Sequence, residues 1–246
     1  MNKSTVLYFS IILLFSSISH ATNEMKQVTL AEEQRLTLVL AKNKQGGDKA
    51  QQTYLDGVFR LAQHNNIDSL ALFSVTQTLA DQYQPEAFAM YAWHNEKAST
   101  QVRQSDDYKT KLKPLQKFGW DELAAADVDM KDLSHYQFDE HKTYTLAEVW
   151  LKDAAEYAKY YKGSASLREK IGAKVIFKHT PNEYNSLKRG AQGPDFLILI
   201  EWPNKNGPMQ YVQSPEFKKY EKYITAGVEK LGWYALRLNN ETEQTY

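Results

Sequence analysis

The stretch PDFLILIEWPNKNGPMQYVQSPEFKKYEKYITA, residues 194–226, decides the fold because an earlier stretch of the chain repeats its pattern. Residues 85–117, PEAFAMYAWHNEKASTQVRQSDDYKTKLKPLQK, align with it at a constant offset of 109 and share eight identities in 33 positions. The identical pairs are Pro85/Pro194, Trp93/Trp202, Asn95/Asn204, Gln101/Gln210, Gln104/Gln213, Ser105/Ser214, Lys109/Lys218 and Lys113/Lys222. Self-similarity at a fixed offset is typical of a structural repeat. The sequence therefore predicts two tandem copies of one unit.

Each copy shows the same order of secondary-structure elements. Short apolar runs predict strands, and longer amphipathic stretches predict helices, in the order strand, helix, strand, strand, helix, strand. In the first half the expected elements cover residues 36–41, 48–64, 69–76, 87–93, 99–118 and 124–130. In the second half they cover residues 144–151, 154–171, 174–179, 196–202, 209–230 and 233–238. This order predicts an α+β fold built from ferredoxin-like βαββαβ units.

Composition and charge exclude several classes of protein. The chain has 246 residues, with 42% hydrophobic and 24% charged residues, which is ordinary for a globular protein. It has no cysteine, so disulfide scaffolds, thiol nucleophiles and Cys-ligated metal centres are excluded. Its 30 basic and 30 acidic side chains balance, which argues against a nucleic-acid partner.

Residues 1–21 have the three-part pattern of a secretory signal peptide. Lys3 gives a positive start, residues 6–18 are mostly apolar, and small side chains precede a break after Ala21. The alternative is a membrane anchor, but a span needs about 20 apolar residues and this run has about 13. We expect cleavage after Ala21, a periplasmic or secreted product, and no stable membrane insertion afterwards.

The predicted organisation is an intramolecular pseudo-dimer. It comprises a signal peptide (1–21), an N-terminal segment (22–34), a first repeat (35–130), a linker (131–142), a second repeat (143–240) and a tail (241–246). Each four-stranded sheet has one face covered by its helices and needs a cover for the other face. The second copy provides that cover, so a monomer is expected.

The second half resembles the dimeric α/β-barrel superfamily and, within it, a small bacterial family of unknown function. The resemblance rests on a strand followed by Asp-Ala-Ala-Glu-Tyr (153–157), on Gly172-Ala173, on Glu-Trp-Pro (201–203) and on Ser-Pro-Glu-Phe (214–217). The first half departs from these motifs, with Ala-Trp-His at residues 92–94. The resemblance implies two ferredoxin-like units packed sheet against sheet, with helices outside.

Strand parity selects the side chains expected inside such a barrel. If the wholly apolar strand faces pack on the helices, the opposite faces point inward. That assumption places Glu148, Glu201, Arg237, Trp150 and Trp233 in the barrel. The same parity places His94 with the inward residues of the first copy, whereas His179 ends its strand and could lie on either side.

These residues are the candidate site, and several interpretations of them stay open. Glu148, Glu201 and Arg237 are the candidate catalytic groups, with the glutamates as acid or base and the arginine orienting an anionic substrate. Alternatively a glutamate pairs with Arg237 structurally, or both glutamates reach water at the barrel mouth. Trp150, Trp233, His94 and His179 are candidate ligand contacts. The alternatives are core packing for the tryptophans and a solvated position for His94.

Three functional hypotheses follow. The first is a protein that binds a small organic molecule between its two sheets. The second is a cofactor-independent enzyme performing proton transfer or monooxygenase-like chemistry with barrel-facing carboxylates. The third is a non-catalytic protein-interaction module. No metal or cofactor is predicted, because metal-binding His spacings and Gly-rich phosphate loops are not recognisable, and His135 and His141 are expected to be solvated.

Overall fold

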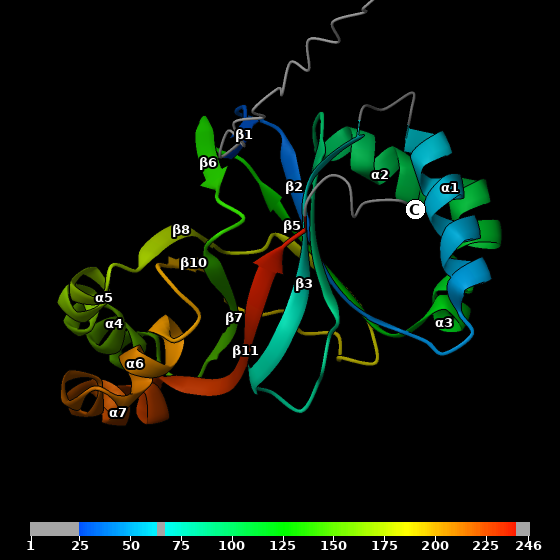
Figure 1. Ribbon diagram of the computed structural model, residues 1–246. Helices are drawn as coiled ribbons and strands as arrows, with labels where there is room; N and C mark the ends of the chain where they lie inside the picture. Colours follow the sequence, from blue (N-terminus) through cyan, green and yellow to red (C-terminus); the bar gives the residue numbers. More distant parts are fainter. Residues whose placement is uncertain (1–24, 63–66, 240–246) are drawn as a thin grey trace, which may run out of the picture.

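The computed structural model describes residues 25–62 and 67–239. The predicted signal peptide and tail lie outside these residues. Two units of strands and helices follow one another in the chain. Their strands form one sheet of nine strands, and their helices lie beside it (Figure 1).

The first unit contains the following elements: β2 (Arg35–Asn43), α1 (Asp48–Ala62), β3 (Ile67–Ala80), β4 (Ala87–Trp93), α2 (Glu96–Gln104), the π-helix η2 (Tyr108–Leu112), the 3-10 helix η3 (Lys113–Leu115), α3 (Gln116–Gly119) and β5 (Trp120–Asp129). The second unit contains β7 (Thr143–Leu151), α4 (Ala154–Gly163), α5 (Ala165–Ile171), β8 (Lys174–His179), β9 (Glu183–Leu187), β10 (Phe196–Trp202), α6 (Gly207–Gln213), α7 (Pro215–Gly227) and β11 (Val228–Leu238).

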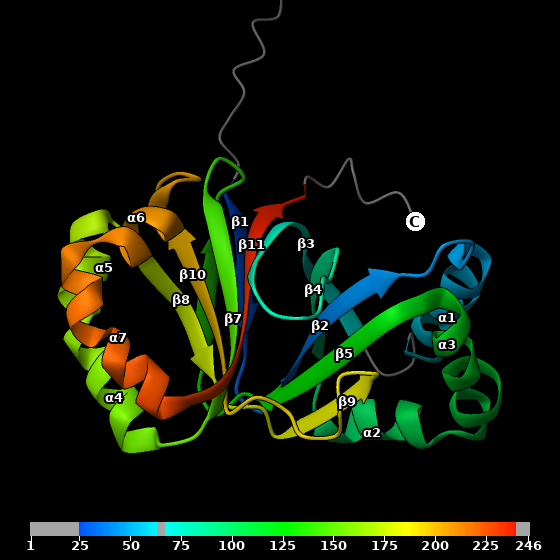
Figure 2. The same cartoon turned by 90° about the horizontal axis from the view of Figure 1, so that it is seen from below.

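The strand order of the sheet is β8-β10-β7-β11-β3-β4-β2-β5-β9. Each unit contributes four neighbouring strands in the same relative order, β8-β10-β7-β11 and β3-β4-β2-β5. The two sets are joined where β11 pairs with β3, and β9 pairs with β5 at the far edge. The two edge strands, β8 and β9, are joined by a short connection in the chain. Because this connection holds both edges of the sheet near each other, the sheet curves into a barrel. The helices of the two units lie on opposite flanks of it (Figures 1 and 2). The predicted α+β fold of ferredoxin-like units is confirmed.

Repeated sequence positions make the same contacts in both units. Trp93 Nε1 donates to Thr37 Oγ1 at 3.0 Å, and Trp202 Nε1 donates to Thr145 Oγ1 at 2.9 Å. Ser105 Oγ accepts the backbone N–H three residues later, as Ser214 Oγ does at the start of α7. Such serines satisfy an amide that has no partner within the helix.

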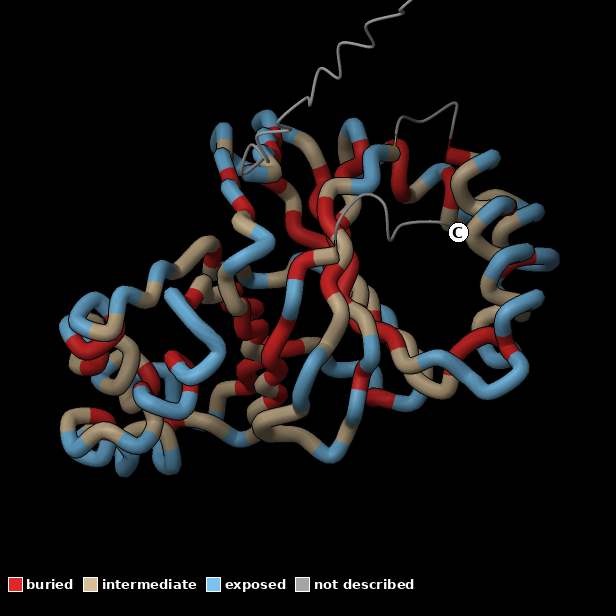
Figure 3. The backbone as a smooth tube through the Cα atoms, viewed as in Figure 1, coloured by how far each residue is buried: buried red, intermediate tan, exposed pale blue. Residues whose placement is uncertain are grey.

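The barrel interior is an apolar core contributed by both units (Figure 3). It includes Leu36, Leu38 and Leu40 of β2, Phe88 and Met90 of β4, Leu146 of β7, Leu197 and Leu199 of β10, and Tyr234, Leu236 and Leu238 of β11. The inward placement predicted for Glu148 is confirmed. The prediction was wrong for β11, because its apolar face fills the barrel and Trp233 and Arg237 therefore point outward.

Three strands were not predicted. β1 (Lys26–Leu30) and β6 (Ser134–Phe138) pair as a ribbon, so the expected linker contains a strand whose apolar residues Tyr136 and Phe138 join the core. His135 and His141 are exposed, as expected. β9 belongs to the second unit but pairs with β5 of the first unit. A prediction made for each repeat separately does not include a strand that pairs across the units. Within the described residues, no helix is long and apolar enough to span a membrane.

Candidate functional site

Core side chains of both units pack against one another between the two halves of the barrel. The cavity beside Glu148, lined by Leu38, Phe88, Leu146 and other core residues, has a volume of about 10 Å³. That is close to the minimum needed for one water molecule. A small organic ligand of the kind expected between the sheets therefore has no room in this cavity beside Glu148.

Glu148 belongs to a buried ion-pair cluster, but its partner is not Arg237. Arg189 Nη1 lies 2.7 Å from Glu148 Oε2, and Arg189 Nη2 donates to Tyr234 Oη at 2.6 Å. Arg189 also lies 3.4 Å from Asp81, and the Tyr234 hydroxyl donates to Asp81. Burial raises the pKa of Glu148, and the charge of Arg189 opposes that rise. The geometry matches the structural-pairing interpretation, with a different arginine.

The other two candidate catalytic residues lie apart from this cluster. Glu201 is half-buried near the opposite end of β10, and the Tyr144 hydroxyl lies 3.4 Å from its Oε2. Arg237 is exposed on the outer face of β11. The structure therefore does not assemble Glu148, Glu201 and Arg237 into one site.

The candidate ligand-binding residues are also dispersed. Trp150 is buried and donates to the Gln192 carbonyl at 3.2 Å, whereas Trp233 is half-buried on the outer face. His94 is exposed after β4. His179 is half-buried at the end of β8, with Nε2 2.8 Å from the Tyr136 hydroxyl.

A cavity of about 480 Å³ lies elsewhere, between the outer face of the first unit's sheet and its helices. Its volume is within the range of small-molecule sites. The sheet contributes small side chains such as Val39 and Ala89, and α1 contributes Leu55 and Phe59. Strand β9 of the second unit completes the wall with residues 185–187. The chain thus builds this cavity from both units.

Small side chains on the sheet explain why the cavity occurs in the first unit. Ala87 and Ala89 line it, and the repeat places Phe196 and Ile198 at the equivalent positions of the second unit. Phe196 and Ile198 there pack with Tyr157 and other aromatic side chains of the helices. This difference is visible in the aligned repeats and is the signal that could have located the cavity from sequence.

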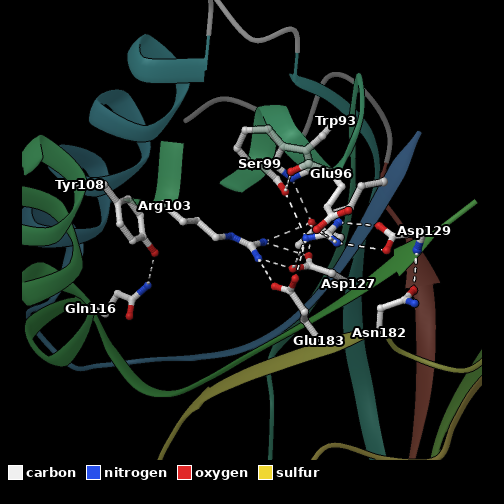
Figure 4. Close-up of polar contacts among 12 residues, drawn as sticks. Trp93, Glu96, Ser99, Arg103, Tyr108, Gln116, Asp127, Asp129, Asn182 and Glu183 are labelled. Carbon is white, nitrogen blue, oxygen red and sulfur yellow. Dashed lines mark hydrogen bonds and ion pairs between the residues drawn. The ribbon is translucent and has the colours of Figure 1, made fainter. Parts of the chain in front are cut away.

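One end of the cavity is polar and is organised around Arg103 of α2. Its Nη2 donates to Asp127 Oδ1 at 2.9 Å, and its Nη1 donates to the other carboxylate oxygen of Asp127. Thr37 Oγ1 donates to Asp127 Oδ1 at 2.5 Å. Burial acts to lower the pKa of Arg103, but Asp127 outweighs it and the pKa rises, so the guanidinium stays charged. Figure 4 shows Arg103 extending from the helix toward Asp127.

A second arginine supports this network from behind. The Arg35 side chain is 1% exposed, and its Nε and Nη2 donate to Asp129 at 2.6 and 3.1 Å. Its Nη1 donates to Glu183 of β9 at 3.1 Å and to Ser99 at 3.3 Å. Glu183 thereby joins the second unit to the polar end of the cavity. The buried charges of the network are paired, as burial requires.

A second polar spot faces the cavity from the helices. Gln116 Nε2 donates to the hydroxyls of Tyr54 and Tyr108 at 3.0 and 3.4 Å. Burial raises the pKa of Tyr54, which keeps its hydroxyl protonated. Tyr108 opens the π-helix η2, a distortion that is frequent at functional sites. In the described residues, no group of three or more His, Asp or Glu side chains is placed to hold a metal ion.

Comparisons with known proteins agree with the fold. Residues 142–230, which include most of the second unit, match the model of a domain of unknown function, DUF1330. The chain is similar to the structure of an anthrone oxidase-like protein, with a TM-score of 0.56 and 10% identity over 87% of this chain and 95% of that one. This likeness supports the barrel architecture and, at that identity, nothing further.

Two other solved structures are similar over comparable lengths. A putative monooxygenase from Lactobacillus acidophilus has a TM-score of 0.42 and 12% identity over 85% of this chain and 95% of that one. A chlorite dismutase from Candidatus Nitrospira defluvii has a TM-score of 0.46 and 10% identity over 87% and 94%. No curated protein matches the chain.

Proposed function

We propose that this protein binds one small, largely apolar organic molecule in the cavity of its first unit. The observation that carries the proposal is the cavity of about 480 Å³ between sheet and helices, with polar groups gathered at Arg103 and at Tyr54, Tyr108 and Gln116. Ligand sites are typically apolar concavities with a few placed polar groups.

The geometry favours binding over catalysis by the barrel-facing carboxylates. Glu148 is engaged by Arg189 and has no ligand-sized space beside it. Glu201 lies at a different place in the barrel and contacts Tyr144. The proposal therefore keeps the binding hypothesis from the sequence and moves the expected binding place from the barrel interior to the outer face of the first sheet.

The signal-peptide pattern adds a location to the proposal. With residues 1–21 removed, the protein would act in the periplasm or outside the cell as a single chain. The first unit holds the cavity, and Phe196 and Ile198 pack at the equivalent positions of the second unit. We therefore expect one ligand per chain.

Filling the cavity tests the proposal. Ala89→Ile copies the residue found at the equivalent position of the second unit, and it should weaken binding of 2-naphthol at least about tenfold, a loss of about 1.4 kcal/mol. Binding is measured by calorimetric titration of the mature chain, with an expected stoichiometry of one. The melting temperature of the variant should not fall, because the added atoms occupy empty space.

The matched control makes the same substitution outside the cavity. Ala155 is exposed in the first turn of α4, so Ala155→Ile should bind 2-naphthol as the unaltered chain does. If Ala89→Ile and Ala155→Ile bind 2-naphthol with equal affinity, the ligand does not bind in this cavity. If neither 2-naphthol nor 2-naphthoate binds saturably to the unaltered chain, the proposal is wrong.

A further inference from the structure

We propose that the ligand is an aromatic carboxylate and that Arg103 is the residue that recognises its carboxylate group. This inference rests on the proposed function and adds the chemical class of the ligand. It is carried by the charges that line the cavity, by the way Arg103 is held, and by the aromatic character of the walls.

Among the residues that the structure describes, the charged side chains that line the cavity have one sign. They are Arg103 and Lys113, and none of the described lining residues is an aspartate or glutamate. The carboxylates of Asp127, Asp129 and Glu183 lie behind Arg103 and Arg35 rather than at the cavity surface. A ligand therefore meets cationic groups and neutral hydroxyls and amides, which complement an anionic group.

Arg103 is held in place while part of its guanidinium stays open. The side chain is 22% exposed, whereas that of Asp127 is 1% exposed. A guanidinium carries five N–H donors, and Asp127 engages one on each of the two terminal nitrogens. Nη2 also lies 3.5 Å from Thr37 Oγ1, and Nη1 lies 3.8 Å from Glu183 Oε2. Because the residue lines the cavity, the N–H groups that face it remain for the planar, two-oxygen acceptor that arginine matches best.

Asp127 is a positioning residue in this arrangement. Its Oδ1 accepts from Thr37, and Thr37 Oγ1 in turn accepts from Trp93 Nε1 at 3.0 Å. These contacts fix the carboxylate, which fixes the orientation of Arg103. Arg35 lies 3.9 Å from Asp127 and adds positive charge behind it.

The aromatic side chains that line the cavity favour a ligand with aromatic rings. Within the described part of the chain, six aromatic side chains line the cavity, namely Tyr54, Phe59, Tyr91, Trp93, Tyr108 and Trp120. Aromatic rings pack favourably on one another in offset or edge-to-face geometry. A planar ligand can place its rings among these side chains with its carboxylate at Arg103.

The test compares two probes of the same size that differ in charge. At pH 7, 2-naphthoate should bind to the mature chain more tightly than 2-naphthol. Arg103→Met alone would leave Asp127 buried without its main partner, so the Arg103→Met/Asp127→Asn double variant carries the test. It should lose at least about tenfold affinity for 2-naphthoate, the worth of a charge-assisted hydrogen bond. Its affinity for 2-naphthol should change less than about threefold, because no charged contact is lost there.

Two further variants make the outcome specific. Arg60→Met removes an exposed arginine from α1 without touching the cavity and should leave both affinities unchanged. Asp127→Asn alone keeps Arg103 but loosens its orientation, so it should weaken 2-naphthoate binding less than the double variant. A circular-dichroism melt of each variant separates loss of folding from loss of recognition.

Each outcome decides one claim. If 2-naphthol binds as tightly as 2-naphthoate, the ligand class is wrong and the binding cavity stands. If 2-naphthoate is preferred equally by the double variant, Arg103 is not the recognition residue. If neither probe binds to the unaltered chain, the proposed function itself fails.

Discussion

His179 shows at the residue scale how burial changes the chemistry of a side chain that the sequence marks only as a strand end. Its ring stacks on Phe177 at a centroid distance of 4.9 Å, and Nε2 lies 2.8 Å from the Tyr136 hydroxyl. Burial disfavours the charged imidazolium and lowers the pKa of His179 to about 4, from an ordinary value of 6.5. The imidazole of His179 is therefore uncharged at neutral pH, and it packs at the end of the barrel.

The lowered pKa predicts a specific pH dependence of stability. Between pH 6.5 and 4 the unfolded chain binds a proton at His179 and the folded chain does not, so this residue destabilises the fold as the pH falls. Its contribution is at most about 3 kcal/mol. His179→Gln keeps a partner for Tyr136 and should flatten the pH profile of the unfolding free energy in this window, measured by urea titration.

The exposed His94 supplies the control for that measurement. His94→Gln should leave the profile of the unaltered chain in place. A profile that His179→Gln leaves equally steep between pH 6.5 and 4 would contradict the assignment.

At the scale of elements, α4 and α7 of the second unit meet so closely that glycine is required at the contact. A Cβ added at Gly227, the last residue of α7, would lie 2.4 Å from the backbone nitrogen of Tyr157. At Gly163, the last residue of α4, a Cβ would lie 2.2 Å from the ring of Tyr220. The backbone cannot move out of the way, whereas the half-buried Tyr220 ring can turn.

This contrast predicts different costs for the same substitution. Gly227→Ala should destabilise the protein by about 1–3 kcal/mol, because overpacking shifts the two helices apart. Gly163→Ala should cost less, because the Tyr220 ring can turn away from the added Cβ whereas the backbone of Tyr157 cannot. Thermal unfolding of both variants checks the order, and the reverse order would show that the two helices can separate without penalty.

At the scale of the whole molecule, the Arg189 cluster joins segments that are distant in the chain. Asp81 follows β3 of the first unit, Glu148 and Tyr234 lie on β7 and β11, and Arg189 follows β9. The side chains of Arg189, Asp81 and Glu148 are at most 2% exposed. The cluster therefore links the two units of the barrel through buried charged side chains.

A double-mutant cycle measures this coupling. Removing one partner leaves a buried charge, so Glu148→Leu and Arg189→Met should each cost about 3–5 kcal/mol. The double variant should cost clearly less than the sum, because Asp81 keeps Tyr234 and the backbone N–H of Gln82 as partners. Lys111→Met, which breaks an exposed pair with Asp107, should change stability by less than about 1 kcal/mol. Strictly additive costs in guanidinium titrations would mean that Glu148 and Arg189 act independently.

The sequence by itself determined the element order, most strand positions and the inward direction of Glu148, because repeats and strand alternation are local properties. It did not determine which face of β11 fills the barrel, and so misplaced Arg237 and Trp233. The aligned repeats place Ala87 and Ala89 where the second unit has Phe196 and Ile198, but the tertiary structure decides that a cavity forms there. Ala87 and Ala89 create space only because helices arch over them, Arg103 reaches Asp127 from another element, and β9 arrives from the other unit. Such long-range juxtapositions depend on packing, which strand and helix periodicity do not encode.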